Sequence, residues 1–461
     1  MLTALAFLVG FFTLLGLALV RHPIFGLYAY LATFYIHPPS RWWAQNLPDL
    51  RWALLSGAIT LLAIFIHRQR LQQARTAWYA STPGVLLIAF VAWLWLQSLW
   101  ALDAEAHVEA TVQFTKYLVA FYLIHRLAET PDRVRDILLV HVAGCTYLGV
   151  LAFSASGFVG GRLNGVGGPG IDDANSLGMF LATGVVSAAI LVLVEQGWRR
   201  VFCIVAAPII LNGIVLAASR GAFLGLLAGG FVLFLVKPPK YARLFWSLAI
   251  VGALGAVSLM DQRFIDRMLS ITDAVERTEE IDASAESRWE LVAAQLRMFP
   301  EYPFGAGHKG TAVLSPRFLD ARWLTHRPGE DKSAAARSSH NTFLTALVEQ
   351  GIPGALIYFA FVAWGVFAVR RLRRDVRADS SREKAYGGAP AAALAVVLVA
   401  GMFTDYLMAE VQVWMLALMV AHRLSTVRAQ ADLSATSAAR VRAAASAAQS
   451  ALQPTPSLSD R

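Results

Sequence analysis

Two arginines stand out because their side chains suit a substrate that carries phosphate. Arg220 directly follows an apolar run, and a charge at that depth is costly unless it is paired or hydrated. Its planar guanidinium can donate two parallel hydrogen bonds to a diphosphate. Arg288 stands in a Ser-Arg-Trp tripeptide and is a second candidate for the same anion. The alternatives are structural, since Arg220 could snorkel to lipid headgroups and Arg288 could be a solvated helix charge.

A third arginine and a histidine complete the set of candidates. Arg162 lies in a Gly-rich stretch whose backbone amides could approach an anion, although glycines alone indicate this only weakly. Asp172 and Asp173 follow it and could bind a sugar hydroxyl or cap the next helix. His340 precedes another apolar run. A neutral imidazole there could accept a proton from an attacking hydroxyl, or it could serve only as a cap or interface residue.

The sequence offers no conventional cofactor chemistry. It contains no His-Glu-x-x-His or Walker motif and no Cys/His cluster, so we expect no metal, no ATP site and no other cofactor. The two cysteines, Cys145 and Cys203, both lie in apolar stretches, which excludes a disulfide framework. The expected chemistry is group transfer from a donor that brings its own leaving group.

The elements that must position these residues are membrane helices. Of the 461 residues, 57% are apolar and only 15% are charged, whereas soluble domains carry about 25% charged residues. Crossing a bilayer takes about 20 residues. We therefore predict an all-α polytopic membrane protein with about 12 transmembrane helices, or 13, and exclude a soluble enzyme of several domains. The candidate spans are Leu2–Val20, Ile24–Ile36, Leu50–Ile66, Pro83–Leu102, Thr111–His125, Asp136–Phe158, Ser176–Glu195, Val201–Ala218, Ala222–Val236, Leu244–Met260, Phe343–Val369, Ala389–Met408 and Val411–Ala421.

Basic residues predict which side each connection faces. Most of the 40 lysines and arginines fall in alternate connections and in the C-terminal tail, which the positive-inside rule assigns to the cytoplasm. The net charge of +9 therefore reflects topology, and we expect membrane lipids and no nucleic acid as partners. Arg162, Arg220, Arg288 and His340 all fall on the outer side.

These patterns divide the chain into four parts. Residues 1–260 form the N-terminal part of a helix bundle, and residues 341–423 form its C-terminal helices. Residues 261–340 form a long outer segment, where 265–275 and 285–299 have the spacing of amphipathic helices that could roof the bundle. Residues 424–461 are an Ala/Ser-rich, low-complexity cytoplasmic tail that we expect to be mobile.

Four motifs in order resemble the O-antigen ligase family. His340-Asn341 is followed by nine residues and then by Gly351-Ile352-Pro353-Gly354, which is similar to the family's His-Asn-x9-Gly-x-x-Gly signature. The resemblance covers roughly residues 136–421. The other landmarks that it includes are Ser219-Arg220-Gly221-Ala222, Ser287-Arg288-Trp289 and Pro303-Phe304-Gly305-Ala306-Gly307.

The resemblance implies a GT-C-type membrane glycosyltransferase with a long periplasmic segment, in a bacterial inner membrane. Such an enzyme takes a glycan from undecaprenyl diphosphate and joins it to a lipid A-core sugar at the periplasmic face, with inversion and without metal or ATP. Arg220 and Arg288 would bind the diphosphate, and His340 would be the general base. Arg162 and Asn341 would be further substrate-binding residues, and Arg162 matches less securely.

The acceptor and the branch of the family stay open. O-antigen polymerases and protein O-oligosaccharyltransferases resemble the same landmarks. The segment 37–43, His-Pro-Pro-Ser-Arg-Trp-Trp, is similar to ligases associated with exosortase systems. A lipid-linked oligosaccharide flippase is the alternative of another class, which the scarcity of charge within the spans disfavours.

Overall fold

The computed structural model describes residues 1–71, 77–155, 157–159, 162–163, 165–259, 283–324 and 335–451. Within these ranges the chain is helical, apart from a short antiparallel hairpin of β1 (Phe158–Val159) and β2 (Arg162–Leu163). The helix predicted over 265–275 lies outside the described residues.

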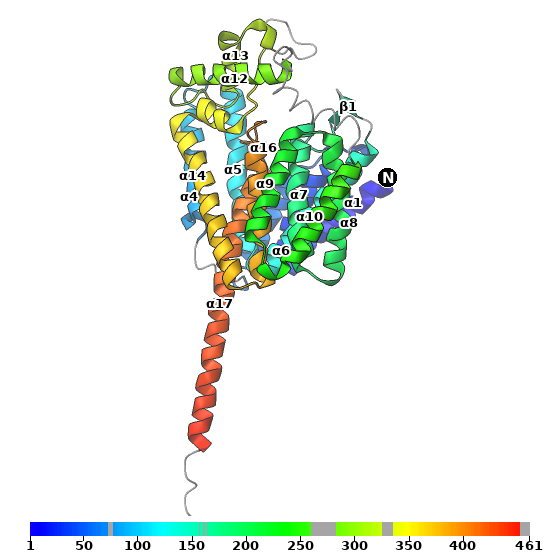
Figure 1. The fold of residues 1–461 in the computed structure, drawn as a ribbon, viewed down its shortest axis with the longest axis vertical. Helices are drawn as coiled ribbons and strands as arrows, with labels where there is room; N and C mark the ends of the chain where they lie inside the picture. The colour runs from blue at the N-terminus through cyan, green and yellow to red at the C-terminus, as the bar shows by residue number, and fades with distance from the viewer. Residues whose placement is uncertain are drawn as a thin grey trace, which may run out of the picture.

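Every predicted span falls on a helix of one elongated bundle (Figure 1). The helices are α1 (Leu2–Val20), α2 (Ile24–Ile36), α3 (Trp52–Ile66), α4 (Thr82–Gln97), α5 (Ala104–Leu127), α6 (Pro131–Ser154), α7 (Ala174–Val194), α8 (Gly197–Ala217), α9 (Arg220–Val236), α10 (Ala242–Leu259), α14 (Thr342–Ala378), α16 (Gly388–Ala400) and α17 (Glu410–Ala451). Short pieces join them: η1 (Pro38–Ser40), η2 (Ala44–Asn46), η3 (Trp78–Ala80), η4 (Pro239–Tyr241) and α15 (Arg382–Ala385).

Fewer helices are long enough to cross a membrane than the predicted twelve. Among the described residues, six are long and apolar enough by length and composition: α1, α6, α7, α8, α14 and the stretch Arg382–Ala400. Three more, α3, α4 and α9, are shorter apolar helices. The 13 residues of α2 extend only about 20 Å, well short of a hydrocarbon core of roughly 30 Å. The six long helices define a multi-pass membrane protein, but they do not confirm twelve crossings.

Helix α7 forms the centre of the bundle. Nearly all of its side chains are buried, and it packs against α6, α8, α9 and α16. Small residues allow this close packing, as is common between membrane helices. Gly184 lies against Cys145 of α6, and Gly178 lies against Ala222 of α9. The first turns of α7 and α9 are therefore held side by side.

A second, smaller layer covers one end of the bundle (Figure 1). It consists of α12 (Ala283–Met298), η5 (Phe299–Glu301), α13 (Gly310–Phe318) and η6 (Ala321–Trp323), and we call it the roof. The helix predicted over 285–299 is observed as α12, and its Trp289 and Leu296 side chains are exposed. Leu291, Met298 and Leu314 of the roof pack with Val348 of α14 in one apolar cluster.

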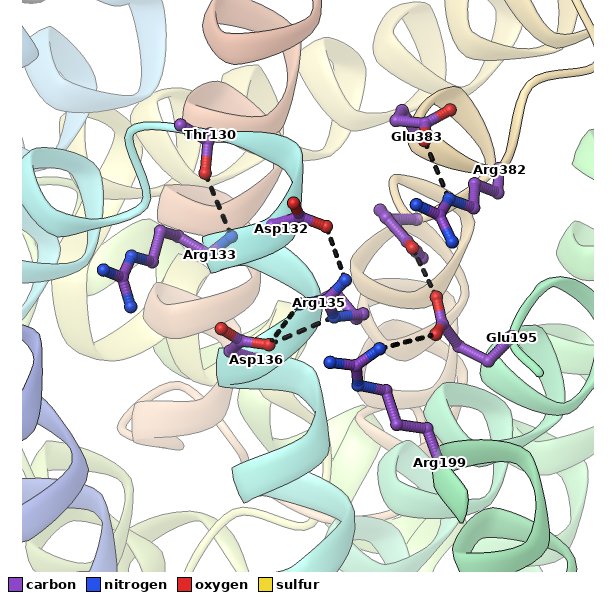
Figure 2. A network of polar contacts seen from close by, with 10 residues as sticks. Thr130, Asp132, Arg133, Arg135, Asp136, Glu195, Arg199, Arg382 and Glu383 are labelled. Atoms are coloured by element: carbon purple, nitrogen blue, oxygen red, sulfur yellow. Dashed lines mark hydrogen bonds and ion pairs between the residues drawn. The ribbon is translucent and has the colours of Figure 1, made fainter. Parts of the chain in front are cut away.

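The opposite end of the bundle carries a network of ion pairs (Figure 2). The buried Arg135 of α6 donates to Asp136, with 2.8 Å between Nη2 and Oδ1. The buried Glu195, directly after α7, accepts a hydrogen bond from Tyr386 and lies 3.7 Å from Nη1 of Arg199. Glu195 thus joins the end of α7 to α8 and to the segment that follows α14, while Arg135 pairs with acidic residues of its own helix, α6.

The low-complexity tail predicted over 424–461 is helical as far as Ala451. Helix α17 continues into it without a break and leaves the bundle at the end opposite the roof (Figure 1). The abundance of alanine explains this, since alanine has the highest helix propensity. The predicted span over 389–408 is also shorter than expected, because α16 ends at Ala400.

A sharp break in α14 joins the bundle to the roof. Gly351 has φ 65° and ψ −172°, which separates a first helical piece, 342–350, from the longer remainder. The turn 303–307 fits against this break, where Ala306 N donates to Val348 O at 3.0 Å and Ile352 N donates to Pro303 O at 2.8 Å. A Cβ atom on Gly351 would overlap the backbone of Phe304 and Gly305. Only glycine fits this position.

We expect Gly351→Ala to lower the free energy of unfolding by about 3 kcal/mol or more. The cause is the combination of a backbone conformation that is open almost only to glycine with the steric overlap. Gly230→Ala in α9 is the matched control, since a Cβ atom there meets nothing within 4 Å. Thermal unfolding of the purified protein in detergent checks this. Equal melting temperatures for the two variants would contradict it.

Candidate functional site

His340 lies at the roof end, two residues before α14 begins and outside the spanning helices. Burial, followed by the positive charges of Arg337 and Arg288, lowers the pKa of His340 from 6.5 to about 4, against the opposing effect of Asp173. The imidazole is therefore neutral near pH 7, with a lone pair able to accept a proton. The charged groups that act on His340 come from separate parts of the chain: Asp173, Arg288 and Arg337.

Asn341 caps α14 with its side chain. Its Oδ1 atom accepts hydrogen bonds from Phe343 N at 2.9 Å and Leu344 N at 3.1 Å, while its Nδ2 atom donates to Met402 O at 3.2 Å. Capping satisfies backbone amides that have no partner within the helix. These contacts give Asn341 a structural task that the sequence analysis did not assign to it.

Thr342 attaches the beginning of α14 to the connection between α16 and α17. Its backbone N donates to Gly401 O at 2.8 Å. Its buried hydroxyl donates to Thr404 O at 3.0 Å and accepts from Tyr406 N at 2.8 Å. Three hydrogen bonds therefore hold the residue two positions after His340.

Two arginines act on His340. Arg288 is in α12 of the roof, and Arg337 is in the segment that leads to His340. Both side chains are partly buried. Arg337 Nη2 donates to Ser287 Oγ at 3.1 Å, which places Arg337 beside the residue preceding Arg288. Sequence reasoning missed Arg337, although it lies only three positions before His340.

Arg220 is connected to the site through two helix caps. Arg220 is the first residue of α9, and Ser219 before it donates to Asn175 Oδ1 at 3.0 Å. Asn175 N in turn donates to Asp173 Oδ1 at 2.8 Å, in the cap of α7. The alternative that Asp173 caps this helix is therefore confirmed. Because Asp173 also acts on the pKa of His340, the beginnings of α7 and α9 and His340 share one region.

Arg162 lies in the hairpin, at the same end of the bundle as the roof (Figure 1). Its backbone pairs with that of Val159. Its side chain lies outside the described part of the chain, so its role in substrate binding stays a prediction.

The arrangement suits an anionic ligand beside a neutral base. Helices α7, α9 and α14 all begin in this region, and helix N-termini favour negative charge. Arg288 and Arg337 add positive charge, and among the described residues Asp173 is the acid that acts on His340. In such a partly desolvated site, electrostatic attraction is stronger than in water.

The fold and the site together define the class of protein. It is a multi-pass helical membrane protein with a polar site between its bundle and its roof. In a comparison with protein families, residues 205–359 match the family described as O-antigen ligase. This match covers part of the chain and supports an O-antigen ligase or polymerase type of function in general. A search of the curated proteins finds no match.

We expect Thr342→Val to destabilise the protein by about 1–3 kcal/mol, because it leaves Tyr406 N and Thr404 O without their partner. Thr342→Ser keeps the hydroxyl and serves as the control. The unfolding temperatures of the two variants provide the measurement. If Thr342→Val is as stable as Thr342→Ser, these hydrogen bonds do not hold the beginning of α14.

Proposed function

We propose that this protein transfers a glycan from undecaprenyl diphosphate to a lipid A-core sugar, at the periplasmic face of a bacterial inner membrane. The observation that carries the proposal is the placement of His340 among Arg288, Arg337 and Asp173, in a chain whose residues 205–359 match the O-antigen ligase family. Arg135 and Arg199, at the opposite end of the bundle, support a cytoplasmic location for that end, because the positive-inside rule counts lysines and arginines.

The proposed reaction is a single displacement at the anomeric carbon. A hydroxyl oxygen of the acceptor sugar forms a bond to C1 of the donor glycan while the bond from C1 to the phosphate oxygen breaks. The electron pair of that bond leaves with undecaprenyl diphosphate, and the hydroxyl proton passes to a ring nitrogen of His340. Attack opposite the leaving group inverts the configuration. Neither metal nor ATP takes part in this proposal.

Each predicted site residue has a proposed task. Arg220 and Arg288 bind the donor diphosphate and stabilise the charge that develops on it, an effect that often dominates in such reactions. Arg162 is proposed to contact the donor as well. Asn341 contributes chiefly by capping α14 and so by positioning His340, its neighbour.

We expect His340→Ala, Arg220→Ala and Arg288→Ala each to lower the transfer rate at least 100-fold, since proton transfer and charge stabilisation each contribute about that much or more. The measurement is transfer by purified protein in proteoliposomes with a lipid-linked glycan donor. Arg317→Ala is the control, because Arg317 is an exposed roof residue that pairs with Glu301 at 2.8 Å. Full activity in any of the three variants would refute the task given to that residue.

The same assay distinguishes the acceptors. Lipid A-core and a second lipid-linked glycan are offered separately to the wild-type protein. Transfer only to lipid A-core supports a ligase, whereas transfer only to the lipid-linked glycan would replace the proposal with a polymerase.

The pH dependence of transfer tests the role of His340. The base must be neutral, so activity is lost as the pH falls through its pKa, and kcat/KM for the donor reports the pKa in the free enzyme. With that pKa lowered to about 4, we expect kcat/KM to stay level down to about pH 5 and to fall below it. A midpoint near the ordinary histidine value of 6.5 would contradict this environment for His340.

A further inference from the structure

Arg337 is a cation whose hydrogen-bonding capacity is only partly used among the residues that the structure describes. It is partly buried, and burial lowers the pKa of its guanidinium. Its Nη2 atom donates a hydrogen bond to Ser287 Oγ. Its Nε atom is buried and has no hydrogen-bond partner among the described residues.

Such a group requires compensation that the described protein does not provide. Partial burial of a charge is costly unless the charge is paired, and burial is the effect that acts on the pKa of Arg337, with no carboxylate of the described ranges opposing it. Its neighbour at the site, His340, is neutral, and Arg288 has the same sign of charge. An anionic ligand would supply the missing partner.

The roof holds Arg337 in position from several sides. Its backbone N donates to Ser315 Oγ of α13 at 2.7 Å. Two residues on, Ser339 Oγ accepts from Gln295 Nε2 of α12 at 3.0 Å. The arginine is therefore presented by a backbone that two roof helices fix, which lowers the entropy lost when a ligand binds.

We propose that Arg337 binds the diphosphate of the lipid-linked donor from the roof side, with Ser287 orienting its guanidinium. This inference rests on the proposed function and deepens it. A guanidinium carries five N–H donors, so Arg337 can donate to phosphate oxygens while Nη2 keeps its hydrogen bond to Ser287. As the bond from C1 to the phosphate oxygen breaks, the leaving diphosphate gains negative charge, and Arg337 stabilises it at that moment.

Binding of undecaprenyl diphosphate itself, without a glycan, tests this contact apart from transfer. Affinity is measured with the full-length protein in nanodiscs, and undecaprenyl monophosphate is the comparison ligand. We expect Arg337→Ala to weaken diphosphate binding at least tenfold and to weaken monophosphate binding less. Arg337→Lys should recover part of the loss, because it restores the charge without the planar fork. Arg317→Ala should bind as the wild type does.

A kinetic readout separates ligand binding from a merely structural role. Removing the positive charge beside His340 raises the pKa of that imidazole, so the acid limb of kcat/KM should move to higher pH in Arg337→Ala. Arg288 and Asp173, which also act on His340, remain in place in this variant. Melting temperatures accompany every measurement. Arg337→Gln, which keeps a donor for Ser287 but not the charge, decides the question if the alanine variant is unfolded.

The outcomes distinguish the two proposals. Unchanged diphosphate affinity in a folded Arg337→Ala or Arg337→Gln variant, with a wild type that binds the ligand, overturns the role of Arg337 alone. A wild type that neither binds undecaprenyl diphosphate nor transfers a glycan overturns the proposed function, and the inference with it.

Discussion

The contact between the backbone of Gly351 and the turn 303–307 is the constraint on which the site depends. At this point the bundle and the roof exchange backbone hydrogen bonds, including Gly307 N to Glu349 O at 2.9 Å. Helix α4 reinforces the contact, because Trp93 Nε1 donates to Gln350 O at 2.8 Å and Gln97 Nε2 donates to Glu349 O at 2.6 Å. Helix α14 thus begins within the roof and continues into the bundle as one connected element.

A second constraint is electrostatic. The site combines positive charge with partial burial. Together they lower the pKa of His340, so that it stays neutral while Arg337 keeps its charge. Burial and neighbouring cations act in the same direction on an imidazole. A ligand that carries negative charge would reverse the second effect. The state of His340 is therefore linked to occupancy of the site by an anion.

Much of the fold could be predicted from the sequence because the dominant signal, apolar runs, is local. All candidate spans fall on helices, and α12 lies where helical spacing indicated it. The number of membrane crossings could not be predicted as well, because an apolar run can form a helix too short to cross alone. Helix α2, with 13 residues, is an example. The tail was predicted from its low complexity, but its alanine content determined the structure.

The site was only partly predictable, for a physical reason. His340 and Arg288 could be selected because their motifs are recognisable, and the structure brings them together with Asp173. Arg337 has no motif. Its position emerges from contacts with Ser287 and Ser315, which are 50 and 22 residues away in the sequence. The cap formed by Asn341 was missed because a motif shows that a residue is shared within a family, not which contacts it makes.

The first helical piece of α14 also sets a geometric relationship between His340 and the bundle. Residues 342–350 make up nine residues of helix, which rise about 13 Å and complete two and a half turns. One residue more or fewer before Gly351 would turn the imidazole by about 100° around the helix axis and change its height by about 1.5 Å. The number of residues between His340 and Gly351 thus sets the direction of the imidazole around the helix axis and its height above the bundle. The acceptor of the proposed transfer would have to match both.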